Sequence, residues 1–164
     1  MSSLWGHRHN DGMADATCTL RDAAPADADA VAALVDAAYL HHVERLGGKP
    51  GPMTLDYDEV LARDRATLAE LDGTLVGVVV LSEDDEGFCI SNVAVHPRHR
   101  GRGVGRQLLE HAEAAARSAG HQSIYLFTHE LMTENLSLYT RIGYVEYARR
   151  DRGRATLVFL RKPL

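Results

Sequence analysis

The sequence predicts a single α/β (α+β) domain whose central sheet is mixed and mostly antiparallel, with about seven strands and about four flanking helices. Two turn signals, Asp72-Gly73 and Asp151-Arg152-Gly153, each separate two strand-like runs and therefore indicate antiparallel hairpins. Between these hairpins, the apolar run 88–95 passes through a glycine-rich turn into a helical pattern and then into the strand-like run 123–128. A strand–helix–strand unit of this kind indicates a parallel pair within the sheet.

The remaining elements follow from apolar periodicity and from the residues that begin and end helices. Strands are expected over residues 17–20, 66–71, 75–82, 88–95, 123–128, 144–149 and 155–160. Helices are expected from Pro25, over 56–63, over 104–119 and over 133–141. Asp27 is the expected cap of the first helix, a loop is expected over Gly47–Pro52, and the acidic segment Ser82–Gly87 is expected to form a turn.

Length and composition limit what this domain can do. The 164 residues fit one domain, and 45% apolar with 25% charged residues is typical of a soluble globular protein. The net charge of −5 gives no electrostatic case for a nucleic-acid partner. No apolar run approaches the roughly 18 residues of a membrane span, so we expect no membrane partner and a cytoplasmic location. Residues 1–16 are polar and aperiodic, which predicts a flexible leader before a domain over 17–164.

Metal chemistry has no support in the sequence. Cys18 and Cys89 lie far apart without metal-type spacing, and we expect them to be buried free thiols. His41 and His42 are adjacent, so they lack the i,i+4 spacing that brings two helical side chains onto one ion. We therefore expect no metal site.

The stretch from Asn92 to Gly105 carries the main functional signal. An apolar strand turns at Pro97 and passes through Gly101, Gly103 and Gly105 into a helix. Glycines allow a backbone to approach a ligand closely, and the free N–H groups at the start of a helix favour an anion. Basic residues of the chain also gather here, over 98–106, which favours a small phosphorylated ligand over a polymer.

Two common phosphate-binding loops do not fit this stretch. A P-loop needs Lys followed by Ser or Thr after its last glycine, and the chain has Arg106-Gln107 instead. The dinucleotide fingerprint Gly-x-Gly-x-x-Gly needs its third glycine where Arg106 stands. The ligand is therefore expected to be held by another kind of glycine loop.

A third pattern fits, Arg100-x-x-Gly103-x-Gly105, between a Val-Ala-Val-His-Pro strand end and a helix that continues with Leu-Leu. Downstream, the segment Leu138–Tyr144 matches the pattern Leu-Tyr-x-x-x-Gly-Phe/Tyr. In this order the two motifs resemble those of the GNAT N-acetyltransferase superfamily, in its bacterial single-domain form, over about residues 17–162. The resemblance implies the GNAT fold, acetyl-CoA as the acyl-donor substrate and an amine as the acceptor.

The resemblance also implies which residues hold acetyl-CoA. The backbone of Val93 and Val95 would pair with the pantetheine arm along a bulged strand, and the Val95 N–H would polarise the thioester carbonyl. N–H groups over Gly101–Arg106 would hold the pyrophosphate. The cofactor-binding residues implied in this way are Val93, Ala94, Val95, Arg100, Gly101, Arg102, Gly103, Val104, Gly105, Arg106, Asn135 and Tyr139.

Two of these residues lie on the helix over 133–141. Tyr139 matches the family tyrosine that protonates the departing thiolate. The alternative is that Tyr139 is a core residue of an amphipathic helix without a catalytic role. The family asparagine that contacts the cofactor has its counterpart at Met132. Asn135, one helical turn before Tyr139, is expected to make that contact instead.

The general base has no family counterpart in this chain. The two positions where relatives carry a glutamate are Cys89 and Phe127, and neither is acidic. Glu130 and its neighbour His129 are the nearest substitutes, acting directly or through water, and Ser91 is a candidate to hold that water.

The resemblance places the acceptor surface on the first two helices, their loop and the closing hairpin. Acidic residues there suit a cationic amine and equally suit a solvated face. The candidates are His41, His42, Glu44, Asp56, Tyr57, Asp58 and Glu59. The expected activity is acetyl transfer to a primary amine in a ternary complex. The alternative is a non-catalytic acyl-CoA-binding sensor or interaction module, and pairing among relatives makes a homodimer possible.

Overall fold

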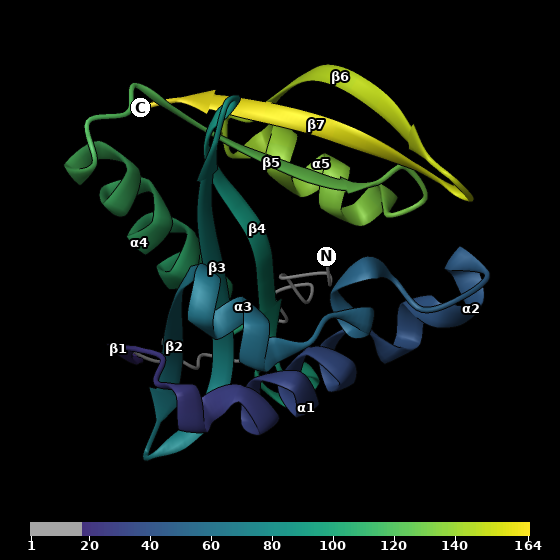
Figure 1. Cartoon of the computed structure of the whole chain (residues 1–164). Helices are drawn as coiled ribbons and strands as arrows, with labels where there is room; N and C mark the ends of the chain where they lie inside the picture. Colours follow the sequence, from purple (N-terminus) through teal and green to yellow (C-terminus); the bar gives the residue numbers. More distant parts are fainter. Residues whose placement is uncertain (1–17) are drawn as a thin grey trace.

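The computed structural model describes residues 18–164, so the predicted leader lies outside this part of the chain. Seven strands form one sheet in the order β1-β2-β3-β4-β5-β7-β6 (Figure 1). The strands are β1 (Thr19–Asp22), β2 (Arg65–Leu71), β3 (Thr74–Asp84), β4 (Gly87–Val95), β5 (Ser123–His129), β6 (Val145–Arg152) and β7 (Ala155–Pro163). The α-helices are α1 (Ala28–Tyr39), α2 (Val43–Leu46), α3 (Tyr57–Arg63), α4 (Val104–Ser118) and α5 (Thr133–Arg141). Short 3-10 turns are η1 (Pro25–Asp27), η2 (Leu40–His42), η3 (Gly51–Thr54) and η4 (Pro97–His99).

Neighbouring strands of this sheet run antiparallel except β4 and β5, which run parallel on either side of the crossover helix α4. The predicted mixed, mostly antiparallel sheet is therefore confirmed. The β2–β3 turn is also confirmed, because Asp72 and Gly73 adopt φ values of +50° and +78°. Two successive positive φ values are what a two-residue type I′ turn requires. Within residues 18–164, no helix is long and apolar enough to cross a membrane.

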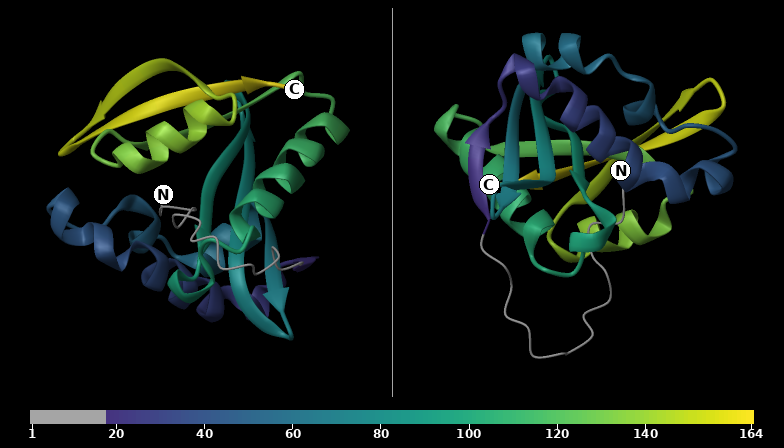
Figure 2. Two further views of the ribbon diagram at one scale, coloured as in Figure 1. Left: turned by 180° about the vertical axis from the view of Figure 1, so that it is seen from behind. Right: turned by 90° about the horizontal axis from the view of Figure 1, so that it is seen from below.

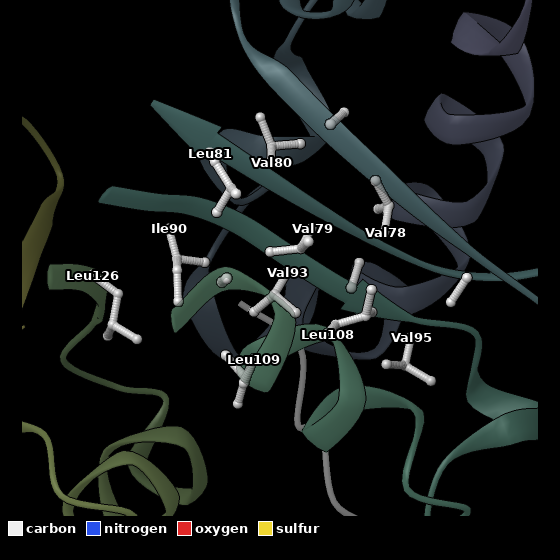
Figure 3. Close-up of a cluster of buried hydrophobic side chains, with 14 of the residues drawn as sticks. Val78, Val79, Val80, Leu81, Ile90, Val93, Val95, Leu108, Leu109 and Leu126 are labelled. Carbon is white, nitrogen blue, oxygen red and sulfur yellow. The ribbon is translucent and has the colours of Figure 1, made fainter. Parts of the chain in front are cut away.

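Helices cover both faces of the β2–β4 half of the sheet (Figures 1 and 2). Helices α1 and α3 lie on one face, and α4 lies on the other with Leu108 and Leu109 buried against β3 and β4 (Figure 3). Gly77 on β3 permits this approach. A Cβ atom at Gly77 would lie 2.9 Å from Leu108 Cδ1 and 3.0 Å from Val104 Cγ1. The first turn of α4 is thus positioned by a missing side chain on β3.

The β5–β7–β6 half of the sheet has a separate small cluster on one face. Alternate residues of β5 point to opposite faces, so Leu126 joins the main core while Tyr125 joins Cys89 and Phe159. The Arg150 guanidinium lies 4.2 Å from the centre of the Phe159 ring and covers this cluster. Cys18 and Cys89 are buried free thiols, as predicted.

The predicted acidic turn over Ser82–Gly87 is mostly strand, which corrects the sequence-based boundary. β3 runs to Asp84, and β4 begins at Gly87. Two of the acidic residues that suggested a turn, Asp84 and Glu86, interact with side chains of the other half of the sheet. Asp84 accepts a hydrogen bond from Tyr125 Oη, and Glu86 forms an ion pair with Arg150.

Three smaller boundaries also differ. β1 covers 19–22 and not 17–20, and residue 17 is outside the described part of the chain. Asp27 does not cap α1 with its side chain, because its carboxylate accepts from the Ala24 N–H at 2.7 Å and pairs with Arg21 at 2.9 Å. At the last hairpin, Asp151 and Arg152 belong to β6, and the Asp151 carboxylate accepts from Thr156 Oγ1 at 2.7 Å.

Candidate functional site

The centre of the candidate site is the point where β4 and β5 separate (Figure 1). The two strands pair over only three positions, ending at Ile90 opposite Leu126, although β4 continues to Val95. At the same point β4 carries a bulge, because Val80 pairs with Asn92 and Leu81 pairs with Ile90, which leaves Ser91 extra. The bulged strand that the family resemblance implied is therefore present.

Beyond the bulge, one edge of β4 has no strand partner among the described residues. The His96 N–H donates to the Val76 carbonyl at 2.8 Å, and alternate residues of an antiparallel pair share this orientation. Asn92 and Ala94 therefore direct their backbone groups towards β3, whereas Val93 and Val95 direct theirs away from it. The Val93 and Val95 side chains are buried in the core (Figure 3), so only their backbone faces the open edge.

A buried polar network fixes the strand at the bulge. Asn92 Oδ1 accepts from Tyr39 Oη at 2.9 Å, and Asn92 Nδ2 donates to Tyr57 Oη at 3.2 Å. Tyr57 Oη donates in turn to the Pro52 carbonyl at 2.7 Å, and burial raises the pKa of this phenol. The network ties α1, η3 and α3 to β4. The role of Asn92 was not predicted from the sequence, although one amide inside an apolar strand signals a buried hydrogen-bonding group.

The glycine loop follows this edge directly. Gly101 and Gly103 adopt φ values of +74° and +82°, and Gly103 is the N-cap of α4. The Gln107 N–H donates to the Gly103 carbonyl at 3.1 Å, so the N–H groups of Val104, Gly105 and Arg106 precede the first intrahelical bond. A helix start whose first N–H groups lie outside the intrahelical hydrogen bonds, at the positive end of the dipole, is suited to an anion such as a pyrophosphate.

Arg100, unlike Arg102 and Arg106, directs its side chain into the protein. Its Nη2 donates to the Ala38 carbonyl near the end of α1 at 2.8 Å, and burial lowers the pKa of the guanidinium. Its side chain therefore ties the loop to α1. Arg102 and Arg106 are exposed at the helix start, where positive charge adds to the field of the dipole.

Asn135 and Tyr139 lie one helical turn apart on α5, and both are buried. The Tyr139 ring makes an edge contact with Tyr144, with 5.7 Å between ring centres. Burial raises the pKa of Tyr139, so its hydroxyl is protonated at neutral pH. That is the state a proton donor requires.

The positions of the missing glutamates hold groups that cannot act as bases at neutral pH. Burial raises the pKa of Cys89 to about 12, and Phe127 has no titratable group. Glu130 is 39% exposed, and its Oε2 lies 3.7 Å from Arg149 Nη1. His129 Nδ1 accepts from the Leu131 N–H at 3.1 Å, and burial lowers the pKa of the imidazole. In the neutral ring the proton therefore resides on Nε2, and His129 is a hydrogen-bond donor in this arrangement.

A pocket of 410 Å³ lies beside the bulge. It is bounded by the loop after α2, the bulge residue, the end of β5 and the β6–β7 hairpin. Its lining residues are Leu46, Gly47, Gly48, Lys49, Pro50, Gly51, Pro52, Ser91, Phe127, Thr128, His129, Met132, Arg152, Arg154, Ala155 and Leu157. The loop and the closing hairpin are the segments expected at the acceptor surface.

The acidic residues named from the sequence are not in this lining. Asp56 accepts from the N–H groups of Asp58 and Glu59 at 3.0 and 3.4 Å and so caps α3, while Tyr57 belongs to the network at the bulge. Glu130 is also outside the lining, whereas its neighbour His129 is part of it. The structure thus brings Ser91, Phe127 and His129 together in the lining of one pocket.

Comparison with known families agrees with this arrangement. A family model described as "Acetyltransferase (GNAT) family" matches residues 32–144, more than half of the chain. The chain therefore belongs to the GNAT acetyltransferase family. The matched region runs from α1 through the glycine loop to the end of the Leu138–Tyr144 segment, so it includes both motifs.

Individual proteins are similar to this chain in sequence or in fold. An "IAA acetyltransferase" of Azospirillum brasilense is 33% identical over 84 residues, which are 50% of this chain and 55% of the relative. The chain spans about half the length of the curated relatives that it matches. A GCN5-related N-acetyltransferase of Rhodopseudomonas palustris has the same fold, with a TM-score of 0.76, 22% identity and coverage of 93% of this chain and 99% of the other. YncA of Salmonella typhimurium, solved with acetyl-CoA, is similar in fold with a TM-score of 0.66 and 23% identity. The match covers 90% of this chain and 94% of YncA.

Proposed function

We propose that this protein is an N-acetyltransferase that transfers the acetyl group of acetyl-CoA to a primary amine by direct attack in a ternary complex. The open edge of β4 is the observation that carries the proposal. Val93 and Val95 present backbone donors and acceptors beside the bulge, and the same chain segment continues into the anion site at Gly103. An extended amide-containing arm joined to a pyrophosphate matches that sequence of groups, and coenzyme A has this structure. YncA, a relative in fold, was solved with acetyl-CoA.

The reaction follows from these groups. The amine nitrogen attacks the thioester carbonyl carbon, and the C–S bond breaks with its electrons going to sulfur. The Val95 N–H is directed to the open edge and would stabilise the developing oxyanion. Tyr139 would donate a proton to the thiolate. Because a thiol has an ordinary pKa of about 8.5, its thiolate is already a fair leaving group, and this step needs modest help.

The proton lost by the amine needs an acceptor. Glu130 remains the proposed base from the sequence, and its Oε2 lies 3.7 Å from Arg149 Nη1. A water held at Ser91 would relay the proton, since Ser91 Oγ donates to the Val80 carbonyl at 3.1 Å and keeps its lone pairs free for a water. This arrangement predicts that Glu130→Gln lowers kcat more than it changes KM for the amine.

A second function has one specific observation in its favour. With Cys89 and Phe127 at the two family base positions, a non-catalytic acyl-CoA-binding module would keep the loop and lose the chemistry. Thiol release from acetyl-CoA with a panel of primary amines separates the two functions. Acetyl-CoA binding without thiol release on any amine would favour the binding module.

The variant Tyr139→Phe tests the proton donor in the same thiol-release assay. We expect a loss of about 10- to 100-fold in kcat with acetyl-CoA affinity retained, because the variant removes a proton donor and little packing. Tyr144→Phe is the matched control, since it removes a neighbouring buried hydroxyl that the proposed chemistry does not use. An equal loss in both variants would assign the Tyr139 effect to packing.

The proposal includes a cytoplasmic location and a homodimer. The first was predicted from the sequence, and no helix of residues 18–164 contradicts it by being able to span a membrane, while the pairing implied by the family resemblance supports the second. Light scattering that returns the mass of one chain would contradict the dimer.

A further inference from the structure

The pocket beside the bulge has a pronounced charge asymmetry. Lys49, Arg152 and Arg154 line it, and no aspartate or glutamate among residues 18–164 does. The three cations come from two separate segments, the loop after α2 and the β6–β7 hairpin, so they meet only in the fold. Each side chain is exposed, and none forms an ion pair with any residue in the described part of the chain. The nearest carboxylate in sequence, Asp151, accepts its hydrogen bond from Thr156.

Away from these cations, the pocket is lined by hydroxyl groups and an imidazole where β4 and β5 separate. Thr128 is 2% exposed, and its hydroxyl has no hydrogen-bond partner in the described part of the chain. A buried hydroxyl without a partner costs free energy unless a ligand or water satisfies it. Ser91 and Thr128 both line the pocket just beyond Ile90 and Leu126, the last β4–β5 pair, and His129 lines it one residue further along β5. These groups are suited to hold a small polar group, such as an amine, next to the open edge of β4.

Apolar side chains make up much of the remaining lining. They are Leu46, Pro50, Pro52, Phe127, Met132 and Leu157. Along β7, Leu157 lies between the hairpin pair Arg152–Ala155 and the position opposite Phe127, so a ligand that follows this strand has a polar head, an apolar body and an anionic tail. A diamine or polyamine would place its second positive charge among Lys49, Arg152 and Arg154, where it would be repelled.

We propose that the acceptor is a small amine that carries an anionic group, separated from the amino group by a short apolar segment. The inference rests on the proposed acetyltransferase function and specifies its substrate class. The amine would lie at Ser91 and Thr128, the apolar segment against Phe127 and Leu157, and the anion between Lys49 and the two hairpin arginines. Arginine presents paired N–H donors to an oxyanion, which suits either a carboxylate or a phosphonate.

A matched ligand series tests this inference. The compounds are 4-(aminomethyl)benzoate, its methyl ester, the corresponding phosphonate and 1,4-bis(aminomethyl)benzene. Binding to the coenzyme A-loaded full-length protein is measured by calorimetry, and kcat/KM by thiol release from acetyl-CoA. We expect the anionic compounds to exceed the ester by about tenfold, because the tail charges are exposed and each contact is screened.

The hairpin variant Arg152→Gln/Arg154→Gln should remove this preference by lowering the affinity and kcat/KM of the anionic compounds towards those of the ester. Arg117→Gln, an exposed charge change on α4 outside the pocket, is the control and should alter neither compound. Equal or tighter binding of the ester or the diamine, or no binding of any compound, would overturn the inference. Turnover without an anion preference would overturn it and leave the acetyltransferase function standing. Anion-dependent binding with no acetylation of any amine would support the ligand class and contradict the proposed function.

Discussion

The two sides of the β4–β5 opening differ in the groups that form them: backbone groups on one side and side chains on the other. The proposed donor side, from Val93 to the start of α4, uses backbone groups that strand pairing and positive φ values aim in fixed directions. The proposed acceptor side uses side chains on the loop after α2 and on the β6–β7 hairpin. Backbone geometry follows from short local patterns, whereas exposed side chains on two distant segments vary without changing the fold. This difference explains why the donor could be inferred from the sequence and the acceptor could not.

Gly103→Glu should have the largest effect, because it acts on the backbone of the donor side. The φ of +82° at Gly103 disfavours any side chain, and a carboxylate would lie at the proposed anion site. We expect acetyl-CoA affinity to fall by about 100-fold or more, measured by calorimetry.

Gly120→Glu is the matched control for this variant. Its φ is +87°, and open space surrounds the glycine at the other end of α4. Comparable losses of affinity in the two variants would mean that backbone strain, and not the anion site, governs binding.

Lys162→Met tests the connection between the two halves of the sheet. Lys162 on β7 pairs with Glu113 on α4 at 2.7 Å, and Tyr144 Oη donates to the same carboxylate at 3.5 Å. Without the lysine, a nearly buried carboxylate loses its charge partner, so we expect about 2 kcal/mol less unfolding free energy in chemical denaturation. Glu113→Gln/Lys162→Met, which removes both charges, should recover part of that loss. A double variant less stable than Lys162→Met would contradict the pairing account.

Gly77→Ala should disturb the donor side without touching the loop. The added methyl group would press on Leu108 and Val104 in the first turns of α4. The two closest contacts are with side-chain atoms, and the Ala94 carbonyl oxygen lies 3.3 Å away, so we expect a cost of about 1 to 2 kcal/mol in unfolding free energy. Acetyl-CoA affinity should fall several-fold as the helix start shifts. Unchanged affinity with reduced stability would separate the position of α4 from the donor site.

The smallest effect concerns pH and the α1–α2 junction that leads to the acceptor loop. Burial lowers the pKa of His42 to about 4, and neither ring nitrogen has a hydrogen-bond partner among residues 18–164. As pH falls from about 6.5 to about 4, the unfolded chain binds this proton before the folded chain does, so the unfolding free energy decreases through that window. His42→Phe should flatten the decrease in part, since burial also lowers the pKa of other histidines. These are His41, His99, His111 and His129.

Denaturation series at pH 7, 6 and 5 measure this effect. His121→Phe, at a partly exposed imidazole paired with Glu83, serves as the comparison. The same pH slope in wild type and His42→Phe would contradict the account.

The parts of the fold that were predictable have short-range causes. Asp72-Gly73 determines a turn type, the glycines at 101 and 103 need positive φ, and α5 has the boundaries that its apolar spacing indicates. The errors arose where distant partners override local composition. The residues of Ser82–Gly87 appear turn-like until Tyr125 and Arg150 pair with them across the sheet.

The candidate site divides in the same way. The bulge, the loop and the buried positions of Tyr139 and Asn135 follow from two motifs in order. Asn92 was missed because its partners, Tyr39 and Tyr57, lie on two helices far away in sequence. The cationic lining of the pocket was also missed. Lys49 and the hairpin arginines are about a hundred residues apart along the chain, and no local pattern relates them.

The orientation of the β4 edge can be tested one amide at a time. In a titration of the 15N-labelled protein with acetyl-CoA, the account predicts large amide shifts and new exchange protection at Val93 and Val95, whose N–H groups face the open edge. Asn92 and Ala94, whose N–H groups face β3, should shift much less. Equal shifts along β4, or shifts confined to Asn92 and Ala94, would contradict the claim that this edge holds the donor.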